Sequence, residues 1–265
     1  MYKPSKKLGQ NFLADRKVLD RIIEVANISK DDTVLEIGPG QGSLTYALCQ
    51  KAGKVIAVEK DEGLFDYLEN KFSNINNLEL VNKDILEFLS SEFRIQNYKI
   101  VANIPYYLTS FLLRKIFSLE SKPLEMILMV QKEVAERICS KYGEMNLLAI
   151  SVQMFAEPEI LFYVSKNSFW PKPKVDSAVI KLKVHLVKSS LREFNRVNEE
   201  KFFDLVKAGF SSKRKLLANN LHDKLGVSKN DIYDIFKEIN LNVKARAQDL
   251  NIKDWQNLYK RFDEK

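Results

Sequence analysis

Short apolar runs alternate with segments of helical spacing through the first half of the chain. The segments with helical spacing are 43–52, 61–72 and 110–120. Ser43 and Asp61 stand where N-cap residues are expected. The apolar runs predict strands buried on both faces of a sheet. These predicted strands are 34–38, 55–60, 78–84, 99–104 and 126–131. This alternation predicts an open, mostly parallel sheet with right-handed crossovers.

The pattern changes in the second half of the chain. Residues 161–165 and the alternating run 175–185 predict a closing antiparallel pair of strands, joined by the Pro-rich, aromatic and basic loop 166–174. A polar, linker-like stretch follows at 187–200. Four short helices are expected after it, at 201–210, 212–226, 228–239 and 252–262. We therefore predict an α/β domain over 1–187 and a small all-helical domain over 188–265.

Two helix boundaries in the second domain have clear sequence signals. Gly226 is expected to stop one helix, and Ser228 is expected to cap the next. Lys213, Arg214 and Lys215 are expected to open the helix that ends at Gly226.

Composition narrows the class of protein. The chain has 265 residues, of which 45% are hydrophobic, so it can bury a large core. The amino terminus lacks the apolar segment of a signal peptide, and no apolar run approaches the length of a membrane span. Cys49 and Cys139 fit small core residues, and with only His185 and His222 besides, no group has metal-ligand spacing. These features predict a cytoplasmic, reduced and metal-free protein.

Basic charge lies at the two ends of the chain. The net charge is +7, with an excess of Lys and Arg over acids in residues 1–21 and in residues 187–265, around a nearly neutral centre. Phosphate backbones favour such a distribution through counterion release. It indicates nucleic-acid binding, and a solvated basic surface is the alternative.

The first predicted strand ends in a glycine loop. Gly38, Gly40 and Gly42 precede a helix, so a ligand can approach the backbone and the positive field of the helix N-terminus. A dinucleotide site is the obvious alternative, but its fingerprint requires glycine or alanine where this chain has Ser43.

Two acids end the next two predicted strands. Glu59 can accept both hydroxyls of a ribose, and Asp84 can meet the amino group of an adenine. Ligands of parallel sheets bind at these carboxyl ends. Helix capping is the alternative role for both acids. Together with the glycine loop, they predict a nucleoside-cofactor site.

The fourth strand ends in an Asn-x-Pro-aromatic turn at 103–107. The Asn103 side-chain oxygen and the Pro105 carbonyl region can accept the two N–H hydrogens of an exocyclic amino group, while Tyr106 stacks on the base. Phe169 could stack on the other face of a flipped base. The alternatives are an ordinary turn with surface tyrosines and, for Phe169, a loop anchored in the core by Phe169 and Trp170. The pattern suits methyl transfer to an amino nitrogen.

Ordered motifs along nearly the whole chain resemble those of the bacterial small-subunit (16S) rRNA adenine N6,N6-dimethyltransferases, the KsgA or RsmA type. They lie at 6–15, 35–45, 58–61, 82–86, 103–110, 129–138, 169–180, 209–221 and 246–250. The resemblance implies a Rossmann-like class I methyltransferase domain. It also implies dimethylation of two adjacent adenines in the 3′-terminal hairpin loop of 16S rRNA within pre-30S particles, with S-adenosyl-L-methionine as cofactor and the enzyme as a monomer.

The resemblance assigns roles to individual residues. It implies cofactor contacts from Asn11, Leu13, Gly38, Glu59, Asp84 and Asn103. It also implies rRNA contacts from the helical domain, where Lys213 and Arg214 stand in place of the family's arginine pair. Lys215 is predicted to bind rRNA with them, and a solvated helix end is the alternative for all three. Residues 143–147 depart from the usual Gly-Arg-Leu-Ser-Val, so RNA contacts there are in doubt.

Two other functions stay open at this point. One is the antibiotic-resistance type of enzyme that methylates large-subunit rRNA, against which Tyr107 and Asp176 argue. The other is a non-catalytic assembly or transcription factor that uses the fold only to bind nucleic acid. Catalysis is expected to be retained, because the chain has Gly38, Glu59, Asp84 and Asn103.

Overall fold

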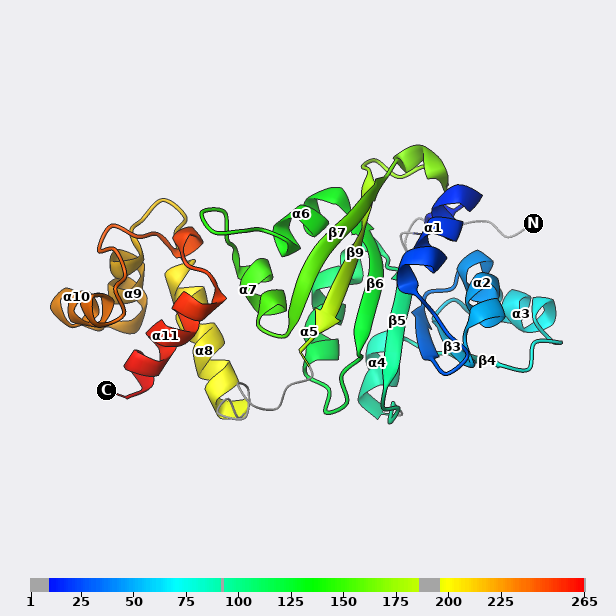
Figure 1. Cartoon of the computed structure of the whole chain (residues 1–265), viewed down its shortest axis with the longest axis horizontal. Coiled ribbons are helices and arrows are strands. Elements are labelled where there is room, and N and C mark those ends of the chain that lie inside the picture. The colour runs from blue at the N-terminus through cyan, green and yellow to red at the C-terminus, as the bar shows by residue number, and fades with distance from the viewer. Residues whose placement is uncertain (1–9, 92, 186–195, 265) are drawn as a thin grey trace. The chain divides into compact units, whose positions relative to one another are not determined.

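The computed structural model describes residues 10–91, 93–185 and 196–264 (Figure 1). The chain forms two compact units, one of residues 1–136 with 156–185 and the other of residues 137–155 with 186–265. The basic residues before position 10 and the expected boundary at 187 lie outside the described residues.

A seven-stranded sheet is the centre of the first unit. Its strand order is β4-β3-β2-β5-β6-β9-β7. The first five strands in this order pair in parallel, and β9 pairs antiparallel with both β6 and β7. The predicted parallel sheet and its closing antiparallel pair are therefore confirmed. The strands are β2 (Thr33–Ile37), β3 (Lys54–Glu59), β4 (Leu78–Asn82), β5 (Tyr98–Asn103), β6 (Glu125–Gln131), β7 (Ala156–Val164) and β9 (Ser177–Val184).

Burial follows position in the sheet. In the inner strand β3 every residue after Lys54 is buried, because neighbouring strands and helices cover it. In β4 none of the five residues is buried. The expectation that residues 78–84 are buried on both faces is wrong, because β4 is the edge strand and has a neighbour on one side only.

The helices of this unit connect the strands. They are α1 (Arg16–Ala26), α2 (Ser43–Lys51), α3 (Glu62–Lys71), α4 (Ile85–Ser91) and α5 (Thr109–Phe117), and α6 (Lys132–Ile138) leads into the second unit. Asp61 caps α3 by accepting from the Leu64 N–H at 3.0 Å, as predicted. Ser43 is the first residue of α2 and not its cap. Gly42 occupies the N-cap with φ +79°, and a Cβ there would lie 2.5 Å from the Phe72 ring, so only glycine fits.

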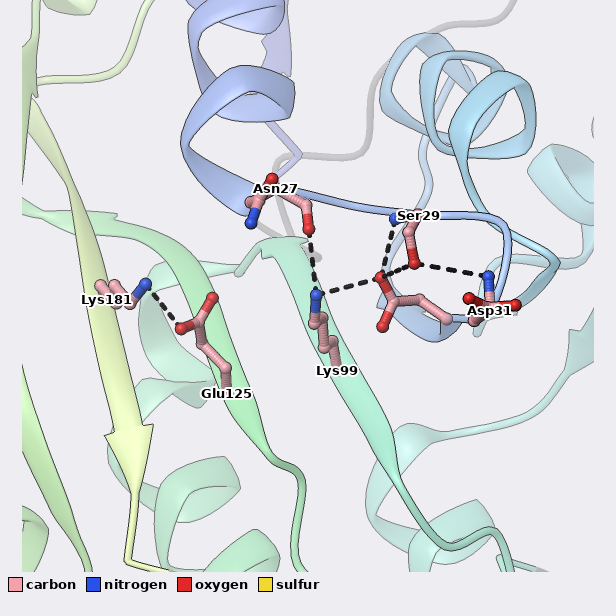
Figure 2. Close-up of polar contacts among 7 residues, drawn as sticks. Asn27, Ser29, Asp31, Lys99, Glu125 and Lys181 are labelled. Carbon is pink, nitrogen blue, oxygen red and sulfur yellow. Dashed lines mark hydrogen bonds and ion pairs between the residues drawn. The ribbon is translucent and has the colours of Figure 1, made fainter.

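The amino ends of the strands carry a polar cluster (Figure 2). The Lys99 ammonium donates to the Asn27 carbonyl and pairs with Asp32, both at 3.0 Å. Asp32 also accepts from the Ser29 N–H at 2.7 Å. Burial tends to raise the pKa of Asp32, but these donors outweigh it and hold the pKa below its ordinary value. The cluster ties the start of β5 to the loop before β2.

The second unit is helical. Its helices are α7 (Leu147–Gln153), α8 (Arg196–Gly209), α9 (Leu217–Leu225), α10 (Lys229–Glu238) and α11 (Ile252–Asp263). Gly226 ends α9 in the left-handed conformation and Ser228 caps α10, as predicted. Trp255, Phe202 and Phe236 are fully buried and form the centre of its core.

Residues 137–155 belong to this helical unit, although the sequence pattern placed them in the first domain. The backbone N–H groups of Gly143 and Met145 both donate to the Gln248 carbonyl, at 3.1 and 3.2 Å. The ring of Phe155 lies 6.4 Å from that of Phe203. The Gln248 bonds join segments about 100 residues apart and the ring contact joins segments about 50 residues apart, which local periodicity does not reveal. Within the described residues, no helix is long and apolar enough to cross a membrane.

Candidate active site

A cavity of about 360 Å³ opens at the carboxyl ends of the parallel strands in the first unit. Eight of the predicted site residues line it, and they come from five separate stretches of sequence: Asn11, Leu13, Gly38, Glu59, Asp84, Asn103, Pro105 and Tyr106. The structure therefore brings together the residues predicted for the cofactor and for the target base. Ligands of open α/β sheets bind in this position.

The glycine loop forms one wall of the cavity. Gly38 follows β2 with φ +66°, a conformation that side chains other than glycine rarely adopt. A Cβ on Gly38 would lie 3.9 Å from the Pro105 ring, so the loop lies close beside the Asn-x-Pro turn. The Gly38 N–H donates to the Val58 carbonyl at 3.0 Å, which ties the loop to β3.

Glu59 lies at the end of β3 and is only 7% exposed. One carboxylate oxygen accepts from the Gly40 N–H at 3.1 Å and the other from the Asp61 N–H at 2.9 Å. Burial raises the pKa of Glu59, and the backbone donors oppose that rise only in part. Each oxygen can accept a second hydrogen bond, so the carboxylate keeps capacity for two hydroxyl donors.

Asp84 is part of an ion pair beside the cavity. Its carboxylate pairs with Lys60 at 2.8 Å and accepts from the Leu86 N–H at 2.8 Å. Burial alone would raise its pKa, but Lys60 and the backbone donors outweigh burial and hold the pKa below the ordinary value. Asp84 is thus anionic at neutral pH, and it also caps the first turn of α4.

The amino-terminal arm reaches the cavity through a short β-ribbon. Its strand β1 (Phe12–Leu13) pairs antiparallel with β8 (Phe169–Trp170). The Asn103 amide nitrogen donates to the Asn11 carbonyl at 3.1 Å. The arm therefore contacts the end of β5 directly, although more than 90 residues separate the two in sequence.

Phe169 does not lie where the sequence pattern suggested. Its side chain is 4% exposed, belongs to the apolar cluster of the first unit and does not line the cavity. The alternative, a loop anchored in the core by Phe169 and Trp170, holds for Phe169 alone. The neighbouring Trp170 is the exposed ring of the loop, at 51%. The alternation of side chains along β8 decides which ring is buried.

The Asn-x-Pro turn follows β5 without a break. Pro105 has φ −54° and leads into the 3₁₀ turn η2 (Tyr106–Leu108), where its carbonyl accepts from the Leu108 N–H at 2.9 Å. The Ile104 carbonyl accepts no hydrogen bond from the described residues. The Tyr106 hydroxyl lies 2.8 Å from the Ser177 hydroxyl, and burial raises the pKa of Tyr106. This bond fixes a half-buried ring on the cavity wall.

Glu36 is a site residue that the sequence analysis missed. It lies within β2, is 1% exposed and lines the cavity. Burial raises its pKa to about 8, and the nearby Glu59 carboxylate adds to that rise. Its Oε2 atom has no hydrogen-bond partner in the described part of the chain. The sequence does contain a signal for this residue, because an acid within an otherwise apolar strand is unusual. A buried carboxyl oxygen without a partner on the wall fits a ligand that carries hydrogen-bond donors, as S-adenosylmethionine does, so the residues present suit that cofactor.

Lys213, Arg214 and Lys215 belong to the helical unit, and all three are exposed. They lie in a turn and do not open a helix, because Leu216 is extended and α9 begins only at Leu217. Lys215 pairs with Asp223 at 2.8 Å and holds the pKa of that carboxylate below its ordinary value. Lys213 and Arg214 have no acidic partner among the described residues.

Comparison with known proteins identifies the family. The model of the family described as "Ribosomal RNA adenine dimethylase" matches residues 1–264. The chain is 44% identical over 266 residues to "Ribosomal RNA small subunit methyltransferase A" of Fusobacterium nucleatum, covering 99% of this chain and 98% of the relative. It is 41% identical over 258 residues to the protein of the same name from Dehalococcoides mccartyi, covering 97% of this chain and 87% of the relative.

Two solved structures share the fold over 96% of this chain at 28% identity. A dimethyladenosine transferase from Plasmodium falciparum superposes with a TM-score of 0.82 and is covered to 98%. The 23S rRNA methyltransferase ErmE superposes with a TM-score of 0.76 and is covered completely, at 100%. The predicted Rossmann-like methyltransferase fold is thereby confirmed. The chain belongs to the ribosomal RNA adenine dimethylase family, and it is an enzyme that transfers methyl groups from S-adenosylmethionine to adenines of ribosomal RNA.

Proposed function

We propose that the substrate is small-subunit (16S) rRNA in pre-30S particles, where two adjacent adenines of the 3′-terminal hairpin loop receive two methyl groups each. This proposal rests on one observation. The residues predicted for the target base, Asn103 and Tyr106, line the same cavity as the cofactor residues Glu59 and Asp84. The names of the relatives that are 37–44% identical favour the small subunit over the large one.

The cofactor is held by groups from both sides of the cavity. Glu59 accepts the ribose hydroxyls with its two remaining lone pairs, and Asp84 meets the adenine amino group. Asn11, Leu13 and Gly38 bring the backbone of the arm and of the glycine loop against the rest of the molecule. When bound, the cofactor supplies a strongly electrophilic methyl group.

The target base is aligned by the Asn-x-Pro turn. The Asn103 amide nitrogen is already bonded to the Asn11 carbonyl, so the amide oxygen is the atom that accepts from the base amino group. The second acceptor is the backbone around Pro105, where the Ile104 carbonyl and a lone pair of the Pro105 carbonyl are available. Tyr106, fixed by Ser177, stacks on the base. Positioning then supplies most of the acceleration, without a general base of tuned pKa.

The rRNA is held mainly by the helical unit. Lys213 and Arg214 are exposed cations without acidic partners in the described residues, so they are free to neutralise phosphates. Lys215 contributes less, because it already pairs with Asp223. The enzyme works in the cytoplasm as a monomer.

One experiment separates the proposed function from its alternatives. The enzyme is titrated with S-adenosylmethionine and then supplied with undermethylated small subunits or with large subunits. We expect cofactor binding followed by transfer to adjacent adenines of the small subunit only. Transfer to the large subunit alone would identify the resistance-type reaction. Cofactor binding without transfer to either particle would contradict the proposal.

A further inference from the structure

Two large aromatic side chains are exposed at the rim of the cavity. Tyr107 is 59% exposed and Phe111 is 64% exposed, and both belong to the cavity lining. Tyr107 lies in η2 and Phe111 lies in the first turn of α5, which follows η2 directly. The two residues lie four positions apart in sequence, and both side chains border the same cavity. Single exposed rings are common on protein surfaces, but two exposed rings that both line one ligand cavity are not.

In the part of the chain that the structure describes, one cation without an acidic partner and one paired cation accompany the aromatic pair. Arg114 lies three residues after Phe111 on α5, is exposed, and has no acidic partner among the described residues. The helix α5 itself contains no acid. Lys60, which pairs with Asp84, also lies near enough to Tyr107 to interact electrostatically with it. Aromatic rings interleaved with cations suit a single-stranded nucleic acid, which presents base faces and phosphates together.

We propose that Tyr107 and Phe111 form a platform that stacks on the nucleobase next to the target adenine, with Arg114 at the adjoining phosphate. The inference rests on the proposed function, because it needs an RNA base in the Asn103 pocket. Extruding the target base has an energetic cost, because the base loses its stacking within the RNA. The platform offsets part of this cost, because the nucleobase next to the target adenine stacks on the two rings at the rim of the cavity. Every base has a flat face, so this stacking does not depend on which base it is. With two adjacent target adenines, the platform holds one while the other reacts.

The test distinguishes stacking by the aromatic rings from the general effect of an apolar surface at these two positions. One double variant, Tyr107→Leu with Phe111→Leu, keeps an apolar surface and removes the rings. A second, Tyr107→Phe with Phe111→Tyr, keeps both rings. Tyr46→Leu is the matched control, because Tyr46 is 54% exposed and does not line the cavity. Each protein is assayed for S-adenosylmethionine affinity and for methylation of a hairpin-loop RNA.

We expect the leucine double variant to lose about tenfold or more in kcat/KM for the RNA, mainly through KM. Its cofactor affinity and the salt dependence of RNA binding should stay unchanged. The ring-preserving variant and the Tyr46 control should match the parent. Arg114→Gln should instead lower the log–log salt slope by roughly 0.7.

A fluorescent base reports the contact itself. With 2-aminopurine beside the target adenine, we expect quenching on binding to the parent and none with the leucine double variant. If the parent methylates the RNA and the leucine variant does so equally well, the platform is wrong while the proposed function stands. A leucine variant that loses cofactor affinity would also overturn the platform. A parent that binds the cofactor but methylates neither the hairpin RNA nor small subunits would instead overturn the proposed function.

Discussion

The amide nitrogen of Asn103 donates to the backbone carbonyl of Asn11 at 3.1 Å. This bond determines which end of the Asn103 amide remains for a substrate, because an amide with its nitrogen engaged accepts through its oxygen. It also makes the catalytic turn depend on the amino-terminal arm, which the β1–β8 pairing holds in place.

Replacement of Asn103 tests this alignment. Asn103→Ala should leave S-adenosylmethionine binding measurable but remove most turnover, a loss of about 2–4 kcal/mol of transition-state stabilisation. Asn103→Asp should do no better, because a carboxylate cannot donate to the Asn11 carbonyl. Single-turnover methylation together with a cofactor titration measures both effects. Parental turnover in either variant would show that the amide does not align the amino group.

Glu59 gives a test of the cofactor site. Glu59→Ala should weaken S-adenosylmethionine binding by roughly 1.5–3 kcal/mol, the range for hydrogen bonds to a charged group. RNA affinity without cofactor should hardly change. Glu69→Ala, an exposed substitution on α3, serves as the control. Equal cofactor affinity of the Glu59 variant and the parent in calorimetry would place the ribose elsewhere.

Glu36 makes stability depend on pH. Its pKa in the folded protein is about 8 against an ordinary value of 4.5, so the folded state holds the proton more tightly. The stability this gives is complete below pH 4.5 and is lost as pH rises through 8. Relative to Glu36→Gln, the parent should therefore lose on the order of a few kcal/mol of unfolding free energy between pH 5 and 8. Denaturant unfolding across that range measures it, and parallel curves for the two proteins would contradict it.

The exposed cations of the helical unit make different predictions for neighbouring residues. Lys213→Gln with Arg214→Gln should weaken RNA binding and lower the log–log salt slope by about 1.4–1.8, which corresponds to two phosphate contacts. Lys215→Gln should change the slope much less, because Lys215 pairs with Asp223. Cofactor affinity should be unaffected in all variants. An unchanged slope in the first variant would place the RNA contacts elsewhere.

Local patterns in the sequence predicted the seven strands of the large sheet, several of the helices and eight of the residues that line the cavity. Alternation of apolar and helical segments predicted a mostly parallel sheet, because strands that alternate with helices along the chain pair in parallel, but it did not predict the strand order. Glycine and acid positions at strand ends predicted the cofactor wall, since parallel strands bring their carboxyl ends to one edge. The cap at Asp61 and the stop at Gly226 likewise depend on neighbours within one turn.

Tertiary structure alone decided what depends on distant contacts. The pairing of β1 with β8 buried Phe169 and left Trp170 exposed, although both are aromatic residues of one loop. Packing around Gln248 joined residues 137–155 to the helical unit. The burial of Glu36 beside the cavity, and the Lys215–Asp223 pair that sets Lys215 apart from Lys213, came from segments brought together in space. Periodicity reports how one segment is buried, whereas these features depend on which segment covers it.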